Sequence, residues 1–592
     1  MADISLPQAA RPEAGLYSFA QQFWDFVRVL WSSTGKWNLS FLTVAVIGVI
    51  VATVFGQVWL NSWNKPFYDA IQQRDLTGFF KQLLVFLEIA GFLLVLNVAQ
   101  AWLREMIKVS SRQWLNIQLF TEWLKPRRAV LLARTEIGVN PDQRLHEDTR
   151  HLTEISTDLG IGLFQAALLL ASFVGVLWGL SKSVVFSIGG MSFAIPGYMV
   201  WCALIYAATG SWLTWRVGRP LVGLDAQRYA REASLRFALV QASEHVEGIA
   251  LNEAEAEEQR HLEAELRQVL VVMRHIVSAT ARLAAITSGY GWIAIVAPIL
   301  MAAPVYFSGK ITFGELMVVV GAFYQVQQSL RWFVDNFSII ADWQATLLRV
   351  MSYYHALLEV DQLKEQGARI TYLEPQPDRI SIENLAISLP NGSAELAEQK
   401  IEIAPGEHIR IVAKPGTGKS TLFRAFAGLW PWGKGTLGLP PRTDTIFLPE
   451  QPYVPPGSLR VALASPFAPG KFSDTDMTSA LEKVGLGHRL QSLDRAARWE
   501  RELSAPELKQ LALARVLLHK PRWVFADEAI DLIDRGTVSV IRQNLGQTAI
   551  VATTADENAD GFYGRTFHLI RPDTVSVAPA PALTATMPAD QG

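Results

Sequence analysis

A short loop between a strand-like run and a helix-like run has the composition of a phosphate-binding site. Residues 409–412 are rich in isoleucine and valine, the loop after them is rich in glycine, and 422–426 are typical of a helix. Backbone N–H groups of such a loop, at a helix N-terminus, bind phosphate oxygens; Lys419 is placed to bridge two phosphates and Ser420 to ligate Mg²⁺. A glycine is usual at the position of Ala413. The predicted nucleotide-binding residues of this loop are Lys414, Pro415, Gly416, Thr417, Gly418, Lys419, Ser420 and Thr421.

Two carboxylates follow a second strand-like run farther along the chain. Residues 523–526 are apolar, and Asp527 and Glu528 come directly after them. With a phosphate loop upstream, Asp527 is expected to hold Mg²⁺ through water, and Glu528 to orient and polarise the attacking water. The sequence therefore predicts Glu528 as the catalytic residue, Ser420 and Asp527 as metal ligands, and ATP with Mg²⁺ as cofactors.

The elements around these motifs form an alternating pattern. Between 379 and 578, short β-rich runs such as 445–448 and 549–552 alternate with helical runs. Such alternation indicates an α/β domain built around a mostly parallel sheet. The preceding residues 356–378 are expected to be a linker, and the tail 579–592, rich in Ala, Pro and Thr, is expected to be disordered.

The part of the chain before the linker is apolar enough to enter a membrane. Half of the whole chain is hydrophobic and only 18% is charged, against about 25% in soluble proteins, and the mean hydropathy is +0.19. A spanning helix needs roughly 20 apolar residues, and six stretches within 39–355 are expected to span. The last is interrupted by Gln325, Arg331 and Asp335, which indicates a wall that faces water or protein. The predicted spans are about 40–60, 82–103, 159–181, 195–215, 283–306 and 312–345.

Positive charge is concentrated in the two long connections between predicted spans. Arginine recurs through 104–150 and 216–282, whereas the short loops 182–194 and 307–311 hold one lysine each. Positive charge stays on the cytoplasmic side of a membrane, so both termini and both long connections are expected in the cytoplasm. Residues 1–38 are expected to contain an amphipathic segment that lies along the membrane surface or packs on the first span. Six spans make one half of a transport pathway, so a dimer is expected; we take it as a homodimer, with a heterodimer as the alternative.

Several other classes of protein are excluded. A net charge of −2 argues against a dedicated nucleic-acid binder, which would be strongly basic. The single cysteine, Cys202, excludes a disulfide scaffold and a site of several thiolates. His146 and His151 are five residues apart, so they lie on different faces of a helix. No metal beyond nucleotide-bound Mg²⁺ is therefore expected.

The segment Leu503–Arg515, between the two nucleotide motifs, resembles the signature and following helix of ABC transporters, and the whole chain resembles an ABC half-transporter. Further markers resemble the SbmA/BacA-like group with a fused ATPase, of the BclA/YddA type and related to peroxisomal ABC transporters. These markers are Asn64–Ala70 with Gln73–Asp75, Asn140–Arg144 with Glu147 and Asp148, Trp332–Asn336 with Trp343, Ala345 and Thr346, and Gly428–Gly433. The resemblance implies an exporter-type fold with six transmembrane helices plus an α/β P-loop ABC nucleotide-binding domain. It also adds nucleotide-binding residues, which are Glu450, Gln451, Ser504, Glu507, Asp534 and Thr554.

Four positions depart from the pattern of that family. Glu450 stands where the family has a glutamine, and Pro506 replaces a glycine of the signature, which removes an N–H group. Thr554 stands at the position of the switch histidine, and in the loop after Glu528 only Asp534 fits. Losing one contact to the γ-phosphate costs about 10²–10³ in rate. Nucleotide binding is therefore expected to persist, whereas hydrolysis is expected to be slow.

The resemblance implies ATP-dependent import of bulky hydrophilic cargo, such as antimicrobial peptides or cobalamin, across the bacterial inner membrane. Membrane lipid and the cargo are the expected partners besides the second copy. An alternative is a proton-driven secondary transporter whose ATPase domain binds nucleotide and hydrolyses it weakly or not at all. A third interpretation is export of lipid or acyl-CoA, as in the peroxisomal relatives. Candidate proton carriers for the alternative are Glu88, Glu244, Glu247, Asp335 and Asp342.

Overall fold

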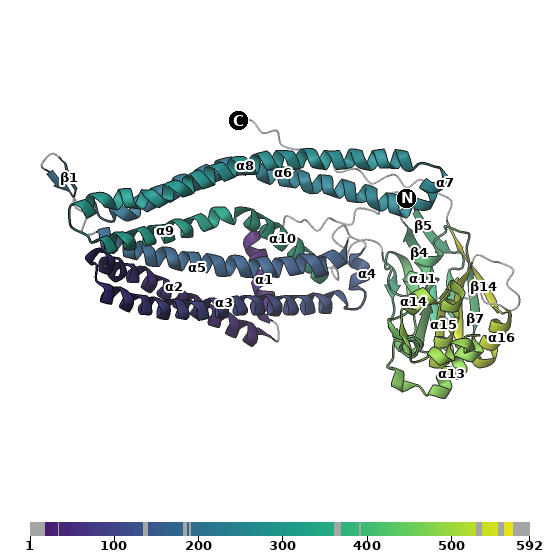
Figure 1. Ribbon diagram of the computed structural model, residues 1–592. Coiled ribbons are helices and arrows are strands. Elements are labelled where there is room, and N and C mark those ends of the chain that lie inside the picture. Colours follow the sequence, from purple (N-terminus) through teal and green to yellow (C-terminus); the bar gives the residue numbers. More distant parts are fainter. Residues whose placement is uncertain are drawn as a thin grey trace. The chain divides into compact units, whose positions relative to one another are not determined.

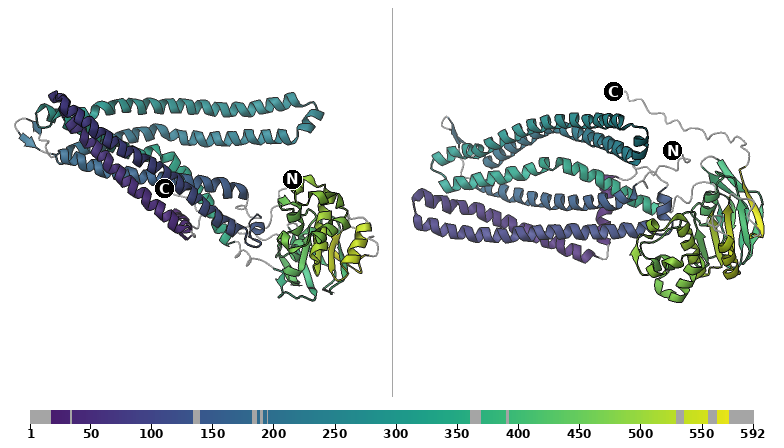
Figure 2. Two further views of the ribbon diagram at one scale, coloured as in Figure 1. Left: turned by 60° about the horizontal axis from the view of Figure 1, so that its bottom comes forward. Right: turned by 45° about the vertical axis from the view of Figure 1, so that its right-hand side comes forward.

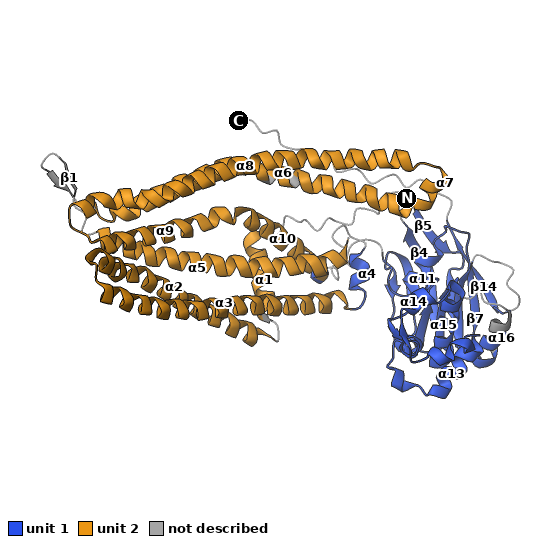
Figure 3. Cartoon of the chain, viewed as in Figure 1, with its two compact units in different colours: residues 1–13, 126–135, 358–592 blue, residues 14–125, 136–357 orange. Residues whose placement is uncertain are grey.

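A computed structural model describes most of the chain, in stretches separated by short gaps. The described residues are 18–32, 35–133, 140–181, 186–188, 191–193, 195–359, 369–389, 392–528, 535–554 and 562–571. They divide into two compact units (Figure 3). Unit 1 comprises residues 1–13, 126–135 and 358–592, and unit 2 comprises residues 14–125 and 136–357.

Unit 2 is a bundle of long helices (Figures 1 and 2). Its helices are α1 (Phe19–Ser32), α2 (Lys36–Gln73), α3 (Leu76–Trp123), the π-helix η2 (Gln143–Asp148) that continues into α5 (Thr149–Ser181), α6 (Tyr198–Glu244), α7 (Val246–Leu251), α8 (Glu255–Phe307), α9 (Phe313–Asp335) and α10 (Phe337–Glu359). Strands β1 (Phe186–Ile188) and β2 (Met191–Phe193) form an antiparallel hairpin between α5 and α6.

The helices of unit 2 agree with most of the predicted spans. The first, second, third and fifth lie inside α2, α3, α5 and α8, and the fourth overlaps α6 from Tyr198 onward. The sixth predicted span, 312–345, is not one continuous helix, because α9 ends at Asp335 and α10 begins at Phe337. The described helices that are long and apolar enough to cross a membrane are α2, α3, Gln143–Ser181 and α8. Six spans therefore stay a prediction.

One face of α2 shows why these helices pack into a bundle. Leu42, Val46, Ile50 and Val54 recur every four residues and are buried, which is the spacing of a single helix face. Large apolar side chains on the other faces of α2, such as Phe55, are exposed. Apolar side chains on both the packed and the outward faces are typical of a helix that is surrounded by lipid.

Helix α1 packs on the bundle by its apolar face. Phe26 and Leu30 are buried, and the rings of Phe19 and Phe23 meet Trp343 edge to face at 5.7 and 6.0 Å between centroids. The predicted amphipathic segment is thus helical and packed against α2, α3 and α10. Trp24 stays 65% exposed, on the face turned away from these contacts.

Unit 1 is built on one large sheet (Figure 1). In spatial order its strands are β3 (Thr371–Tyr372), β8 (Gly433–Gly438), β4 (Ile380–Leu389), β5 (Gly392–Leu396), β14 (Arg565–Ile570), β7 (His408–Val412), β13 (Ala549–Thr554), β12 (Trp523–Asp527) and β9 (Thr445–Leu448), with β6 (Lys400–Ile403) paired to β4. Strands β14, β7, β13, β12 and β9 are parallel. The helices include α4 (Arg128–Leu132), α11 (Lys419–Phe426), α12 (Leu459–Ala464), α13 (Asp474–Lys483), α14 (Trp499–Glu502), α15 (Ala505–His519) and α16 (Arg535–Asn544).

The parallel strands are covered on both faces. Along β12, Trp523 and Phe525 join one apolar core, while Val524 and Ala526 join the other. Successive side chains of a strand point to opposite faces, so a strand buried on both sides reads as a continuous apolar run. This is why the sequence showed these strands clearly and confirms the predicted α/β domain.

The boundary of the sheet domain differs from the predicted one. The expected linker 356–378 contains β3, which pairs in parallel with β8 at Thr371 and Thr436. The main-chain hydrogen bonds of this pair make the end of the expected linker part of the sheet. The tail 579–592 lies outside the described residues.

Candidate nucleotide-binding site

The predicted phosphate loop connects a central strand to a helix. Strand β7 lies between β14 and β13, and α11 begins at Lys419. Gly416 and Gly418 have φ angles of 80° and 116°, a region that glycine enters without steric cost. The first N–H groups of α11 have no acceptor within the helix, so they point outward at its N-terminus. Arg571 donates to the carbonyl oxygen of Gly416 at 2.8 Å and braces the loop.

The two predicted carboxylates lie beside this loop. Parallel pairing of β12 with β13 places Asp527 opposite Thr553, and the Thr553 hydroxyl donates to Asp527 Oδ1 at 2.7 Å. Asp527 is 5% exposed. Glu528 has a φ of 49°, and its N–H donates to the carbonyl of Thr553 at 3.1 Å. The strand pairing therefore fixes the position of both carboxylates.

Lys419 and Glu528 form an ion pair. The side chain of Lys419 is 9% exposed and that of Glu528 is 37% exposed. Lys509, on α15, donates to the backbone carbonyl of Glu528 at 3.3 Å. The cation predicted to bind phosphate thus contacts the carboxylate predicted to activate water.

The residues predicted after β9 and β13 lie at the same edge of the sheet. Glu450 and Gln451 follow β9, which pairs in parallel with β12, and both are exposed. Thr554 is fully buried at the end of β13, and its carbonyl accepts from the N–H of Ala413 at 3.2 Å. Thr554 therefore contacts the start of the phosphate loop through its backbone.

Ser504 and Glu507 cap helix α15. The Ser504 hydroxyl accepts from the N–H of Glu507 at 3.4 Å, and Glu507 Oε2 accepts from the N–H of Ser504 at 2.9 Å. Glu507 also contacts Arg489 at 2.9 Å and His488 at 3.1 Å. The pKa of Glu507 is lowered to about 2, first of all by the hydrogen bond from the Ser504 N–H. Hydrogen bonds from Arg489, the Ser504 hydroxyl and His488 also lower this pKa, whereas partial burial raises it.

Pro506 is compatible with this helix start. It occupies the first turn of α15, where an N–H group has no acceptor inside the helix and a φ near −65° suits the backbone. The departure from the family's glycine is therefore accommodated without breaking the helix. Asp534 lies outside the described residues.

The donors near the loop suit a magnesium ion that is bound with nucleotide. Ser420 lies in the first turn of α11, and Asp527 offers carboxylate oxygens of which the structure engages Oδ1. Hard oxygen ligands of this kind are those that Mg²⁺ uses, together with phosphates. Across the described stretches, no group of three or more His, Cys, Asp and Glu side chains gathers into a metal site.

Sequence reasoning missed three residues that support the site, namely Thr553, Lys509 and Arg571. Thr553 contacts Asp527 across a strand pair, whereas Lys509 and Arg571 contact backbone carbonyls of Glu528 and Gly416. None of the three belongs to a sequence motif that marks its role, because each contact depends on which strands and helices are neighbours.

Unit 2 holds a second polar region that joins two of the family markers. Asp148, 5% exposed at its side chain, accepts from Arg144 at 2.8 Å and from both Nε and Nη2 of Arg349 at 3.2 and 3.1 Å. Trp343 Nε1 donates to Ser156 at 2.8 Å. Arg349 also donates to the Thr346 hydroxyl at 2.9 Å, so Arg349 links the marker that contains Asp148 to the marker that contains Thr346.

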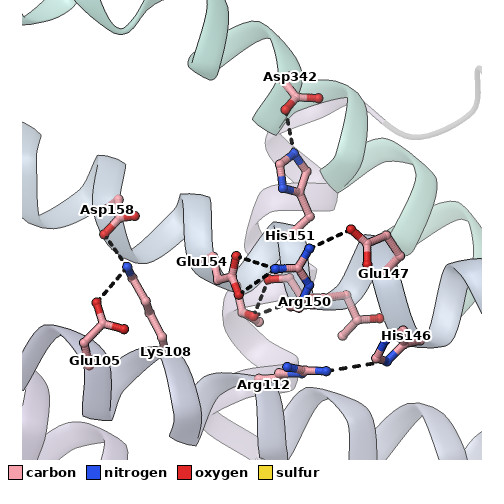
Figure 4. Close-up of polar contacts among 12 residues, drawn as sticks. Glu105, Lys108, Arg112, His146, Glu147, Arg150, His151, Glu154, Asp158 and Asp342 are labelled. Carbon is pink, nitrogen blue, oxygen red and sulfur yellow. Dashed lines mark hydrogen bonds and ion pairs between the residues drawn. The ribbon is translucent and has the colours of Figure 1, made fainter. Parts of the chain in front are cut away.

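Charged pairs continue from this region along α3 and α5 (Figure 4). Lys108 contacts Glu105 and Asp158, each at 3.0 Å. Arg150 contacts Glu147 and Glu154 at 2.7 and 3.2 Å.

Two candidate proton carriers of the alternative have polar partners. Asp342 forms a hydrogen bond with His151 at 2.6 Å, and Asp335 forms an ion pair with Arg331 at 3.0 Å. Glu88, Glu244 and Glu247 are exposed.

Both units match known protein families. Residues 27–307 match the family described as ABC transporter transmembrane region 2, and residues 396–531 match the family described as ABC transporter. The chain therefore belongs to the ABC transporters, as a half-transporter with a membrane region and an ATP-binding domain fused in one polypeptide.

Curated relatives resemble nearly the whole chain. It is 26% identical to the inner membrane ABC transporter ATP-binding protein YddA of Escherichia coli K12, over 87% of this chain and 91% of the relative. It is 26% identical to ABC transporter D family member 2, chloroplastic, of Arabidopsis thaliana (92% and 85%). It is also 26% identical to the human lysosomal cobalamin transporter ABCD4 (91% and 93%).

A solved structure shows the same fold. A bacterial Atm1-family ABC exporter with ATP bound superposes with a TM-score of 0.62 and 15% identity, covering 88% of this chain and 91% of that one. These findings confirm the exporter-type fold, the ABC resemblance, the similarity to YddA, ATP binding and ATP-driven membrane transport as the class of function. The SbmA/BacA grouping stays a prediction.

Proposed function

We propose that the chain acts as a homodimer that imports bulky hydrophilic cargo, such as antimicrobial peptides or cobalamin, across a bacterial inner membrane. Two relatives support this: one is described as an inner membrane protein and another as a cobalamin transporter. The markers of the SbmA/BacA-like group support a peptide as cargo. In this proposal six helices cross the membrane, and both termini and the two arginine-rich connections face the cytoplasm.

The loop 414–421 and the two carboxylates perform the ATPase chemistry in this proposal. The loop's N–H groups and Lys419 would bind the β- and γ-phosphates, while Ser420 and Asp527 would hold Mg²⁺, which would neutralise phosphate charge. Glu528 orients the attacking water. The observation that carries the proposal is the direct contact of Lys419 with Glu528, because bound phosphate then competes with Glu528 for Lys419 and releases the carboxylate toward water.

Residues farther from the loop complete the site in the dimer. Ser504 and Glu507 mark the N-terminus of α15, where N–H groups and the helix dipole favour an anion. We assign this terminus to the γ-phosphate bound by the second copy, and Glu450, Gln451, Asp534 and Thr554 to the surroundings of the attacking water. Thr554 offers no ring nitrogen for this task, so its contribution is through the backbone that holds Ala413.

The experiment is ATP hydrolysis by the full chain reconstituted in lipid vesicles. Glu528→Gln and Lys419→Ala are measured beside it, and Lys400→Ala is the matched control, because Lys400 is an exposed lysine of the same unit that lies on β6, outside the predicted nucleotide-binding residues. We expect hydrolysis by the starting protein and by Lys400→Ala, and its loss in the other two.

Uptake of labelled cobalamin and of a labelled cationic peptide into the same vesicles tests the cargo. ATP-dependent uptake of either one supports import. If the protein binds ATP and yet turns over no faster than Glu528→Gln, hydrolysis is not the motor. An imposed proton gradient that drives uptake in the Glu528→Gln variant would then favour the proton-driven alternative.

A further inference from the structure

Lys509 is a half-buried lysine of α15 whose side chain reaches the backbone of Glu528. Its Nζ donates to the carbonyl oxygen of Glu528 at 3.3 Å. Among the residues that the structure describes, no carboxylate pairs with this amine. The charge of Lys509 is therefore directed at the peptide group of the residue that is predicted to activate water.

The lengths of α15 and β12 bring Lys509 level with Glu528. Helix α15 ends at His519 and β12 begins at Trp523, so the chain turns back between these two residues. The helix from Lys509 to His519 covers about 15 Å at 1.5 Å per residue, and β12 covers about 16 Å at 3.3 Å per residue. Because the two distances match, Lys509 lies beside the residue that follows the strand.

Apolar packing holds this part of α15 in place. Leu513 and Leu517 follow Lys509 at intervals of four residues, so the three side chains share one face of the helix. Leu513 and Leu517 belong to the same apolar core as Val524 and Ala526 of β12. The face that carries Lys509 is therefore the face that α15 buries in this core, and the direction of the lysine does not depend on its one hydrogen bond.

The backbone of Glu528 has a conformation that needs support from its neighbours. Its φ of 49° lies in the left-handed region, which residues other than glycine adopt rarely and at a cost. The N–H of Glu528 donates to the carbonyl of Thr553 at 3.1 Å, and its carbonyl accepts from Lys509. The peptide groups on both sides of the Glu528 Cα are thus hydrogen-bonded, which fixes the direction in which the side chain leaves the backbone.

The contact of the Glu528 carboxylate with Lys419 differs from these two backbone contacts. In the proposed function Lys419 turns to the phosphates when nucleotide binds, so the carboxylate loses this partner. The contacts of the Glu528 backbone with Thr553 and Lys509 involve neither the carboxylate nor Lys419. They are therefore able to persist when nucleotide is bound.

We propose that Lys509 is a positioning residue for Glu528. It holds the backbone of Glu528 in the left-handed conformation, and thereby directs the carboxylate at the attacking water after Lys419 has turned to phosphate. The inference rests on the proposed function, in which Glu528 orients this water. Helix α15, whose N-terminus at Ser504 is assigned to the γ-phosphate of the second copy, thus has a second task within its own copy.

Steady-state ATP hydrolysis by the full chain in lipid vesicles tests this role. Lys509→Met keeps the apolar part of the side chain and removes the donor. We expect kcat to fall by about 10–100-fold, since a displacement of about 1 Å can cost that much. We expect KM for ATP to stay the same, because the loop 414–421 is unchanged.

Two further variants complete this test. Lys509→Arg keeps a charged donor and is expected to recover most of the rate. Lys483→Met is the matched control, because Lys483 lies on α13 and its amine donates to Asn544; it is expected to hydrolyse ATP like the starting protein. An unchanged kcat in Lys509→Met would overturn the inference. A raised KM with unchanged kcat would also overturn it, since Lys509 would then bind nucleotide.

Hydrogen–deuterium exchange separates this inference from the proposed function, because it needs no hydrolysis. Exchange is measured by mass spectrometry in peptides that cover 523–528, with ATP bound, in the Glu528→Gln background. The amide at position 528 is expected to lose protection when Lys509→Met is added and to keep it when Lys483→Met is added. Equal protection in the two variants would overturn the inference. Lost protection in a protein that hydrolyses no ATP would support Lys509 as the anchor of this backbone and contradict the proposed function alone.

Discussion

Lys419 and Glu528 are in direct contact, although they come from the start of α11 and the residue after β12. The contact joins the two functions predicted for this site, because Lys419 is predicted to bind phosphate and Glu528 to activate water. It exists because β7 and β12 are separated in the sheet by β13 alone. Each of the two residues follows the carboxyl end of its strand, at the same edge of the sheet.

Glu528→Gln is expected to keep ATP binding and to lower the rate of hydrolysis by about 10²–10³ or more. The amide is nearly isosteric with the carboxylate, but it cannot accept a proton from the attacking water. The measurement is steady-state hydrolysis together with binding of a fluorescent ATP analogue. A variant that hydrolyses ATP at the original rate would show that another residue activates the water.

Thr553→Val is expected to destabilise unit 1 by about 1–3 kcal/mol, because it leaves the buried carboxylate of Asp527 without its 2.7 Å donor. Thr553→Ser keeps the hydroxyl and serves as the control. The free energy of unfolding is measured by urea denaturation of the full chain, with the unfolding of unit 1 as the observed transition. Equal stability of the valine and serine variants would mean that the hydrogen bond contributes nothing.

The nucleotide motifs were predictable because their signals are local. Strands β7 and β12 are buried on both faces and read as apolar runs. The residue types that follow each run indicate phosphate binding after β7 and water activation after β12. The supporting contacts were not predictable, since Thr553 meets Asp527 only through strand order. Strand β3 gave no signal because its two residues, Thr371 and Tyr372, are too short a run to show a pattern.

The membrane region was predictable as helices but not in how they pack. Apolar runs marked α2, α3, α5, α6 and α8, whereas the break at Asn336 between α9 and α10 went unnoticed. Hydropathy does not register the end of a helix when apolar residues continue beyond it. The contact of Lys65 with Glu315 joins residues 250 positions apart, so only the three-dimensional arrangement could reveal this contact between α2 and α9.

Glu507 is expected to make the cap of α15 sensitive to acid. Its pKa is lowered to about 2 in the folded chain, so its contribution to stability is complete above its ordinary value of 4.5 and is lost as the pH falls through about 2. Glu507→Gln is expected to cost about 0.5–2 kcal/mol at pH 7, as loss of a helix cap does. The difference from the starting protein should shrink steadily between pH 4.5 and 2.5 in urea titrations. A difference that stays constant over this range would show that the charge of Glu507 is not what stabilises the cap.

Asp148→Asn is expected to destabilise unit 2 by about 1.5–3 kcal/mol, since it weakens charge-assisted hydrogen bonds from Arg144 and Arg349. The Asp148 side chain is 5% exposed, so water cannot readily replace these donors. Asp335→Asn is the matched control: its pair with Arg331 is half exposed, and such pairs contribute about 0–1 kcal/mol. In the same detergent, Asp148→Asn should therefore unfold at a clearly lower temperature than Asp335→Asn. If both unfold at the same temperature, the contacts of Asp148 with Arg144 and Arg349 do not stabilise the packing of η2 against α10.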